Sequence, residues 1–451
     1  MKTIKNFSAI TFLALVLSNC VKDDTLDVTP GPVQESPIEE PEIQDRPSVT
    51  LESIDPLAGP KETLVTIMGN NFGNDPNKVQ VFFNNKESEI QSIENTKIIT
   101  AVPIGASTGP VKIAVDGTVV MGPEFDYELT LVVKPYAGST FGLEDGTLET
   151  AKFINPTDMA QDSKGNLYIT DSGNHMIRKI DANGNVTTYA GIVYEPNSTV
   201  TLEDGFRTDA IFNRPSRIAI DNQDNIYISD SGNNAIRKIT PEGDVVTIVQ
   251  KFSNDIGVKD SLVRPNGIAM DPTGTLYVGD TGNNRILKVN PNGRVQLLVG
   301  SDRGFTDGIG FFSQFNAPHG IILGDDSVYV ADAGNNSIRK VGFDGLVITL
   351  AGNGIEGSTD GNATEATFSE PLDVALDNNG NLIVLDTANG SIRQITKDGQ
   401  VITLLKMDNE DMDGGEDATG LNDPSGLFRD ANGTWFIMDR ENHKIKILTY
   451  E

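Results

Sequence analysis

One pattern occurs six times in register between about residue 150 and the C-terminus of this 451-residue sequence. In each copy an Asp is followed three residues later by Asn, and a Pro precedes the Asp by 14 or 15 residues. The six pairs are Asp171/Asn174, Asp230/Asn233, Asp280/Asn283, Asp332/Asn335, Asp386/Asn389 and Asp439/Asn442, at spacings of 59, 50, 52, 54 and 53 residues. A fixed period of this length predicts copies of one structural unit that stack to share a core.

Each copy contains four short β-rich runs separated by turn-forming clusters. In the second copy they are Arg217–Ile220, Asn225–Asp230, Ala235–Ile239 and Val245–Val249. A four-stranded sheet of this size cannot bury both faces alone, but six sheets arranged radially can. The sequence therefore predicts an all-β fold with a six-bladed β-propeller.

The segments Asp171–Arg178 and Asp280–Ile286 resemble the signature of NHL-repeat propellers, and the resemblance covers residues 131–451. Copies one to five place a Gly-containing turn before their fourth strand, whereas the sixth copy ends after its third, at Lys444–Leu448. We therefore expect Leu131–Tyr136 to form the missing outer strand. This pairing closes the ring without an open sheet edge.

Residues 48–130 contain β-rich runs punctuated by Gly, Pro and Asn, and Val65–Gly69 and Val111–Val115 alternate as strands do. Together with Asn71-Phe72-Gly73 and Phe125-Asp126-Tyr127, they resemble an IPT/TIG domain, an immunoglobulin-like β-sandwich. The resemblance implies a spacer domain.

The first 19 residues have the layout of a signal peptide, with Lys2 and Lys5 before an apolar run. Leu17-Ser18-Asn19-Cys20 resembles a bacterial lipobox, which implies lipidation at Cys20; the alternative is an ordinary secretory peptide with an incidental Cys. Residues 20–47 are acidic and Pro-rich, so we expect a disordered tether that reaches about 80 Å. Lys22-Asp23-Asp24 is similar to the export signal of Bacteroidota surface lipoproteins, although a generic acidic linker is the alternative.

The composition narrows the possible partners. A net charge of −29 disfavours nucleic acid, because like charge repels phosphate polymers. A single Cys excludes an internal disulfide. We expect contact with a membrane only through the lipid anchor.

Residues shared by all six copies are interpreted as structural. The Asp/Asn pairs are expected to cap the turn between second and third strands by accepting backbone N–H groups. A base seven residues after the Asp is expected to pair with it across the hairpin, at Arg178, Arg237, Arg339, Arg393 and Lys446. Recurring Asp-Gly dipeptides, as at Asp145/Gly146, are read as loop elements, with calcium binding as the alternative.

Departures from the repeat are the candidate ligand-binding residues. Around the central opening, the residues following the repeat prolines differ between copies and offer mixed donors and acceptors. The predicted ligand-binding set is Asp158, Arg217, Asn266, His319 and Asp373, with Arg440 from the sixth copy and Tyr194 from an insertion in the second. Sugar rings stack on exposed aromatic side chains, and the candidates for this contact are Tyr194, Phe141, Phe206 and Phe305.

No catalytic residue, metal ligand or cofactor is predicted. The sequence contains no G-x-S-x-G or H-E-x-x-H motif. Of its three His, His175 and His443 follow the repeated Asn, where the NHL pattern commonly has His, so a zinc lyase is disfavoured.

A lipid-anchored propeller of this kind resembles the surface glycan-binding lipoproteins encoded beside outer-membrane saccharide importers in Bacteroidota. The resemblance implies an outer-membrane location facing the cell exterior, a polysaccharide or oligosaccharide ligand and a TonB-dependent transporter complex as partner. Two alternatives remain: a propeller enzyme of lyase or lactonase type acting on a saccharide, and a protein-protein interaction module. Fold resemblance alone does not choose among them.

Overall fold

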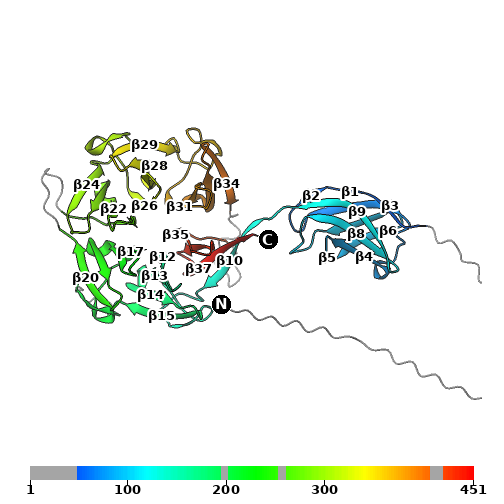
Figure 1. Cartoon of the computed structure of the whole chain (residues 1–451), viewed down its shortest axis with the longest axis horizontal. Helices are drawn as coiled ribbons and strands as arrows, with labels where there is room; N and C mark the ends of the chain where they lie inside the picture. The colour runs from blue at the N-terminus through cyan, green and yellow to red at the C-terminus, as the bar shows by residue number, and fades with distance from the viewer. Residues whose placement is uncertain (1–47, 194–201, 252–260, 407–419, 451) are drawn as a thin grey trace, which may run out of the picture. The chain divides into compact units, whose positions relative to one another are not determined.

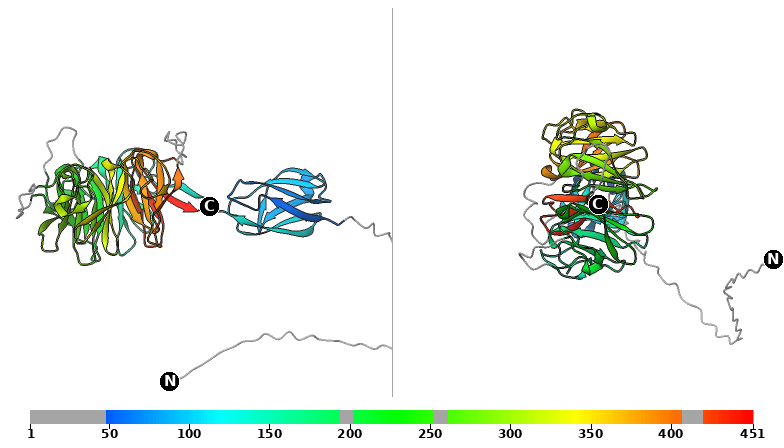
Figure 2. Two further views of the ribbon diagram at one scale, coloured as in Figure 1. Left: turned by 90° about the horizontal axis from the view of Figure 1, so that it is seen from above. Right: turned by 90° about the vertical axis from the view of Figure 1, so that its left-hand side faces the viewer.

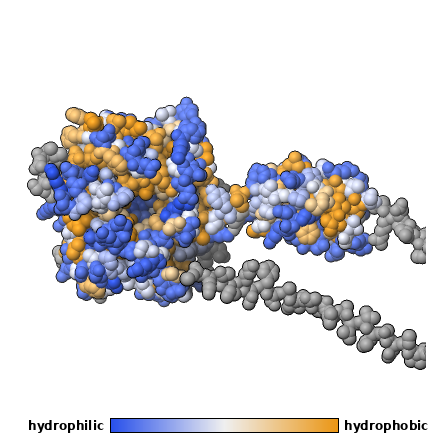
Figure 3. Space-filling view, viewed as in Figure 1, coloured by the Kyte–Doolittle hydropathy of each residue, from blue (hydrophilic) through white to orange (hydrophobic). Residues whose placement is uncertain are grey.

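The computed structural model describes residues 48–193, 202–251, 261–406 and 420–450, which form a β-sandwich and a β-propeller (Figure 1). The signal sequence, Cys20, the tether and Tyr194 lie outside the described residues. None of the helices in the described ranges is long and apolar enough to cross a membrane. On the face seen in Figure 3, hydrophilic residues cover much of each domain, with smaller apolar areas between them.

The sandwich packs two sheets face to face, in the strand orders β1-β3-β7-β6 and β2-β9-β8-β4-β5. Its core contains Val65, Ile67, Val81, Ile113 and Phe125, each at most 1% exposed. These residues come from the alternating runs that predicted strands, because every second side chain points inward. The strands are β1 Thr50–Asp55, β2 Ala58–Gly59, β3 Leu64–Asn70, β4 Val79–Phe83, β5 Lys86–Ser88, β6 Ile90–Glu94, β7 Lys97–Ala101, β8 Gly109–Val115 and β9 Thr118–Tyr127, with the 3-10 helix η1 Pro76–Lys78.

The propeller has six antiparallel blades, as the repeat predicts. Figure 1 shows the blades around the ring, and Figure 2 shows the ring edge-on. The first three blades consist of β12 Pro156–Gln161, β13 Leu167–Asp171, β14 Met176–Ile180 and β15 Asn185–Ala190; β17 Pro215–Ile220, β18 Ile226–Asp230, β19 Ala235–Ile239 and β20 Asp244–Val249; β21 Ile268–Met270, β22 Leu276–Asp280, β23 Arg285–Val289 and β24 Val295–Gly300. The last three consist of β26 Pro318–Leu323, β27 Ser327–Asp332, β28 Ser337–Gly342 and β29 Leu346–Ala351; β31 Pro371–Leu376, β32 Leu382–Asp386, β33 Ser391–Ile395 and β34 Gln400–Lys406; β35 Pro424–Arg429, β36 Trp435–Asp439, β37 Lys444–Tyr450 and β10 Leu131–Ala137.

The ring closes as expected, because β10 pairs with β37 and Val133 lies opposite Leu448. The first strand of each blade contacts the first strands of both neighbours, which gives an inner ring of six strands around the axis. N-terminal and C-terminal chain thus share one sheet, and the last blade has no unpaired outer edge.

Among the described residues, four blades gain a fifth, two-residue strand that the sequence did not reveal. The Asp-Gly loop ahead of each first strand pairs back onto the outer strand of its own blade. These strands are β11 Gly146–Thr147, β16 Gly205–Phe206, β25 Gly308–Ile309 and β30 Gly361–Asn362. Seven 3-10 helices complete the described part of the propeller: η2 Ser172–Asn174, η3 Arg207–Asp209, η4 Ser231–Asn233, η5 Thr281–Asn283, η6 Gly310–Phe312, η7 Ala333–Asn335 and η8 Thr387–Asn389.

The repeated Asp is fully buried in every blade and is paired with a base. The predicted pairs form in five blades, at 3.0 Å for Arg178–Asp171 and Arg237–Asp230, 2.7 Å for Arg339–Asp332, 2.9 Å for Arg393–Asp386 and 2.8 Å for Lys446–Asp439. In the third blade, where Leu287 occupies the expected place, Arg285 reaches Asp280 from two residues earlier at 2.7 Å. The two positions point to the same side of the strand, so either one serves.

The predicted capping role of the Asp/Asn pairs is partly wrong. The Asp side chain does not cap the turn that follows it. Its Oδ1 atom instead accepts the N–H of a residue before the first strand, such as Ile154 for Asp171, while Oδ2 accepts the amide of the repeated Asn. The Asn therefore donates where we expected it to accept, and the Asp connects the second strand to the inner strand.

The Asp of the Asp-Gly dipeptide is a second acidic partner of the same arginine. Arg393 donates to Asp386 and, through its other terminal nitrogen, to Asp360 at 2.7 Å; Asp360 also accepts from Thr403. The guanidinium lies 5.1 Å from the centre of the Phe368 ring. These contacts support the loop interpretation, and the described residues contain no group of three or more potential metal ligands.

Replacing Arg393 by Leu should destabilise the fold by about 3 to 5 kcal/mol, because Asp386 would remain buried without its cation. Adding Asp386→Asn, which keeps the acceptor for the backbone N–H of Ser369, should recover part of that loss. Urea unfolding followed by the fluorescence of Trp435, the single tryptophan, measures both. The exposed control Lys397→Leu should change stability by no more than about 0.5 kcal/mol. Equal effects of Lys397→Leu and Arg393→Leu would refute the role of the ion pair.

Candidate functional site

The side chains that follow the repeat prolines lie on the propeller axis at two different levels. A β-bulge interrupts the pairing of the first and second strands just after the proline, for example between Pro156 and Asp158. The same irregularity follows Pro215, Pro371 and Pro424. A bulge re-aims consecutive side chains, so the single ring that we expected is divided into two layers.

The lower layer is formed by the second residue after each proline. In ring order these residues are Asp158, Arg217, Gly267, Gly320, Asp373 and Gly426. A Cβ atom on Gly320 would overlap the Asp373 carboxylate, and one on Gly267 would overlap the carbonyl oxygen of His319. The three glycines thus leave the axis to the three charged side chains.

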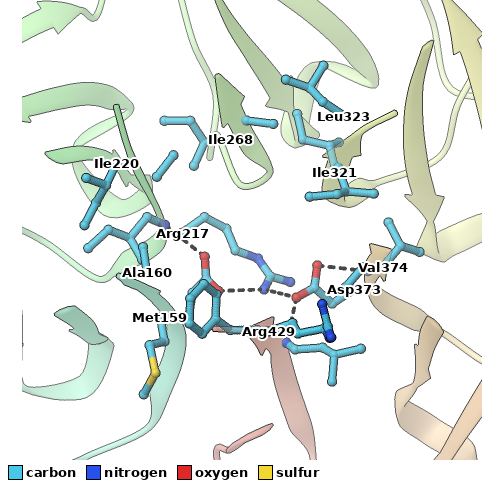
Figure 4. A pocket seen from close by; sticks show the side chains of 18 of the residues that line it. Met159, Ala160, Arg217, Ile220, Ile268, Ile321, Leu323, Asp373, Val374 and Arg429 are labelled. Carbon is cyan, nitrogen blue, oxygen red and sulfur yellow. Dashed lines mark hydrogen bonds and ion pairs between the residues drawn. The ribbon is translucent and has the colours of Figure 1, made fainter. Parts of the chain in front are cut away.

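Arg217 crosses the axis from the second blade to the fifth (Figure 4). Its guanidinium lies 2.7 Å from Asp373 Oδ2 and 3.7 Å from Asp158 Oδ1, and it donates to the carbonyl oxygen of Leu372 at 2.9 Å. Each carboxylate also accepts a backbone N–H of the next blade, from Ile218 to Asp158 and from Leu427 to Asp373. The three residues form a plug that links blades one, two, five and six.

Two carboxylates share one cation in this plug. Burial raises the pKa of Asp158 to about 7, opposed by the positive charge of Arg217 and reinforced by the negative charge of Asp373. Burial also raises the pKa of Asp373, against the effect of Arg217. Because Asp158, Arg217 and Asp373 are each at most 9% exposed, they close the axis and offer a ligand little surface.

Below the plug lies a cavity of about 430 Å³ formed by the far ends of the first strands. Ile220, Ile268, Ile321 and Leu323 line one side of it, as Figure 4 shows. Arg429 lines the same cavity and donates to Asn378 at 2.7 Å. Aliphatic side chains dominate these walls, so the cavity has few groups that could orient a polar ligand.

Above the plug lies a wider cavity of about 890 Å³, which we call the upper basin. The first residues after the prolines and the turns that begin with the repeated Asp line it, and Arg217 is part of its wall. Asn266, His319 and Arg440 of the predicted set are in the basin, whereas Asp158 and Asp373 line the lower cavity.

His319 lies in the upper basin beside Asn266, whose side-chain nitrogen is 3.2 Å from His319 Nδ1. With the Asn266 amide as donor, Nδ1 accepts and Nε2 carries the proton. Burial lowers the pKa of His319 to about 3, and the charges of Arg217, Arg440 and Arg264 lower it further in the same direction. His319 is therefore neutral at neutral pH and presents one N–H donor.

The other predicted residues are placed as follows. Arg440 forms an ion pair with Asp423, and Asn155 donates to the neighbouring Glu441 at 2.9 Å. Phe141, Phe206 and Phe305 are exposed. None of them is among the described residues that line the two axial cavities.

His175 and His443, at the consensus position after the repeated Asn, have a structural role. The Nδ1 atoms of these rings accept the backbone N–H of Arg214 at 2.9 Å and of Asn155 at 3.2 Å, each in the next blade around the ring. Asn234, Asn284 and Asn336 make the equivalent bond through Oδ1. Five of the six blade junctions thus share this contact.

The residue before each repeat proline was not among the predicted site residues. All six have a positive φ of 45° to 52°, and Arg214, Arg264, Ala317 and Glu370 line the upper basin. The complete set is Asn155, Arg214, Arg264, Ala317, Glu370 and Asp423. The sequence could have indicated these residues, because they differ between copies as strongly as the residues after the proline do.

The geometry thus defines a six-bladed β-propeller with a plugged axis, preceded by an immunoglobulin-like sandwich. Residues 49–127 match the IPT/TIG domain, and residues 153–180, 212–239, 262–289 and 368–395 match the NHL repeat. The chain therefore carries an IPT/TIG domain followed by NHL repeats, as its motifs indicated.

The chain is 28% identical over 289 residues to the Arabidopsis thaliana protein SUPPRESSOR OF QUENCHING 1, chloroplastic, and the match covers 58% of this chain. The chain spans only about a quarter of that relative, 27% of its length. Two solved structures are similar in fold: auxiliary nutrient binding proteins from Bacteroides thetaiotaomicron (TM-score 0.64, 18% identity, 90% of this chain and 98% of that chain) and Bacteroides ovatus (TM-score 0.56, 17%, 90% and 99%). At these identities the two structures show a shared fold.

Asp158 should make the stability of the protein depend on pH, and the substitution Asp158→Asn should remove this contribution. Because the pKa of Asp158 is raised from 3.8 to about 7, the folded protein binds more protons than the unfolded chain between these values. The free energy of unfolding should therefore fall as the pH rises through this window. Relative to wild type, the variant should gain stability as the pH rises from about 4 to about 7, as measured by urea unfolding.

Asp181→Asn is the matched control, since hydrogen bonds from Asn185 lower the pKa of this partly exposed Asp. Its stability relative to wild type should stay level over the same range. A level profile for Asp158→Asn as well would contradict the charge distribution of the plug.

Proposed function

We propose that this protein is a lipid-anchored lipoprotein of the outer membrane that binds an extracellular saccharide in the upper basin. The observation that carries the proposal is the basin itself. It is a polar cavity of about 890 Å³ with a closed floor, lined by residues that break the repeat. The similarity in fold to auxiliary nutrient binding proteins of Bacteroides supports a nutrient as the ligand.

The upper basin suits a hydroxyl-rich ligand because donors and acceptors converge in it. The side chains of His319 and Asn266 lie beside each other on neighbouring blades, and they offer the Nε2–H of His319 as a donor and the amide oxygen of Asn266 as an acceptor. Such pairs recognise the hydroxyl groups of sugars, which both donate and accept. In the lower cavity the walls are mostly aliphatic, and the charged side chains of Asp158, Arg217 and Asp373 are paired with one another.

Binding is favoured over catalysis by the chemistry of these side chains. A general base works best with a pKa near the operating pH, and that of His319 lies near 3. Glu370 is the carboxylate of the basin wall, and it has no second carboxylate beside it among the described lining residues. An acid-base pair for a lyase or lactonase would need both.

The remaining parts of the chain fit a surface location. Residues 1–19 direct export, Cys20 carries the lipid, and residues 20–47 and the IPT/TIG domain at 48–130 act as tether and spacer. The propeller at 131–451 would then present its basin to the exterior, where a TonB-dependent transporter complex takes up the captured saccharide.

Affinity electrophoresis of the full chain in gels that contain different polysaccharides tests binding, with reducing ends measured in parallel. We expect retarded migration without new reducing ends. Replacing Asn266 by Leu should weaken binding roughly 10- to 100-fold, since it removes hydrogen bonds in the basin. The control Arg429→Gln, in the lower cavity, should bind as wild type does.

New reducing ends or unsaturated products would instead establish the enzyme. Unchanged migration over the whole panel would contradict saccharide binding and leave the protein-protein interaction module as the better explanation.

The lipid anchor is tested by Cys20→Ser. In phase separation with Triton X-114 the wild type should enter the detergent phase and the variant the aqueous phase. The control Ser18→Ala should behave as the wild type does. If Cys20→Ser and wild type partition alike, the anchor is disproved.

A further inference from the structure

The charges that line the upper basin are opposite in sign to those of the whole chain. The protein has a net charge of −29, yet five arginines and a single glutamate line the basin, with no Asp or Lys among its described lining residues. The five are Arg214, Arg217, Arg264, Arg303 and Arg440. A local excess of positive charge on so acidic a protein calls for a specific explanation.

Two of the five arginines are already neutralised. Arg217 forms the plug with Asp373 and Asp158, and Arg440 pairs with Asp423 and lies near Glu441. The guanidinium groups of Arg214, Arg264 and Arg303 have neither an ion pair nor a hydrogen bond within the described ranges 48–193, 202–251, 261–406 and 420–450. All three residues are exposed. We call these three the free arginines.

The backbone holds two of the free arginines in position. Arg214 and Arg264 have φ values of 49° and 46°, a region that Asn or Gly occupies more readily. Their N–H groups donate to His175 Nδ1 at 2.9 Å and to Asn234 Oδ1 at 2.8 Å. The fold fixes the backbone at these positions, but it gives no reason for an arginine, since Asn155 and Ala317 fill the same place in other blades.

The free arginines lie on one side of the basin. Arg214 and Arg264 enter from the second and third blades, and Arg303 from the loop after β24. The equivalent positions in the fifth and sixth blades are Glu370 and Asp423, of which Asp423 is paired with Arg440. The basin is therefore polarised, with its positive side next to the neutral pair Asn266 and His319.

We propose that the ligand of the upper basin is an anionic saccharide that bears carboxylate or sulfate groups; this rests on the proposed function and specifies its ligand class. The planar guanidinium group donates two parallel hydrogen bonds to either anion. The three free arginines hold the anionic groups, and Asn266 and His319 take the sugar hydroxyls.

Nucleic acid is disfavoured by the absence of stacking platforms in the basin. Single-stranded nucleic acids bind largely through bases stacked on aromatic rings, and the described lining residues of the basin include no Phe, Tyr or Trp. A short cationic wall beside neutral donors matches the saccharide.

The test uses two pairs of polysaccharides that differ only in charge: polygalacturonate and its methyl ester, and dextran sulfate and dextran. Affinity electrophoresis of the full chain should show retardation by a charged member at least about tenfold stronger than by its neutral partner, because hydrogen bonds from guanidinium groups to an ionised acceptor are stronger than those to a neutral one. The two pairs distinguish carboxylate from sulfate.

The variant Arg214→Gln/Arg264→Gln/Arg303→Gln should lose this preference. The control Lys164→Gln/Lys397→Gln/Arg429→Gln removes the same number of positive charges from the turns and strand ends at the opposite side of the propeller. It should retain the preference. Equal thermal unfolding midpoints would show that both variants are folded, as expected for changes at the surface.

Each of the remaining outcomes would overturn the inference for a different reason. Equal retardation by charged and neutral members would refute it while leaving saccharide binding intact. No retardation by any polysaccharide would refute the proposed function as well. Loss of preference in the control would show that only net charge matters, and stronger retardation by single-stranded RNA, lost in the arginine variant, would identify a nucleic-acid site.

Discussion

The buried aspartate at the end of each second strand is the contact on which the propeller depends. It joins three parts of a blade that are distant in sequence: the loop before the first strand, the turn before the third and the base on the third strand. The Asp-Gly loop adds an outer contact to the same arginine. A buried carboxylate is tolerated only when it is paired and hydrogen-bonded, so a blade that lost one partner would leave a charge in its core.

This constraint frees the axis for function. Because each blade is held by its own ion pair and by contacts with its neighbours, residues at the inner strand ends can differ from blade to blade. In the lower layer they form three glycines and a charged plug; in the upper basin they form a polar, positively charged wall. The repeat provides the scaffold, and departures from it provide the site.

The sequence predicts the blade number, the turns and the closure of the ring because all three follow from period and register. It also indicates the ion pairs, since Asp and Arg seven residues apart meet across a hairpin. It could not separate Asn266 and His319 from Asp158 and Asp373, because a bulge after the proline decides which level each side chain reaches. In the third blade the expected position of the base holds Leu287, and Arg285 forms the ion pair instead, which the spacing of seven residues could not predict.

A crystal structure of the full chain soaked with an oligogalacturonate or a sulfated oligosaccharide tests the central claim most directly. The account predicts an anionic group of the sugar against Arg214, Arg264 and Arg303 in the upper basin, with the plug of Arg217 and Asp373 intact beneath it. A ligand held in the lower cavity, or bound by the repeated Asp and Asn of the turns, would contradict it.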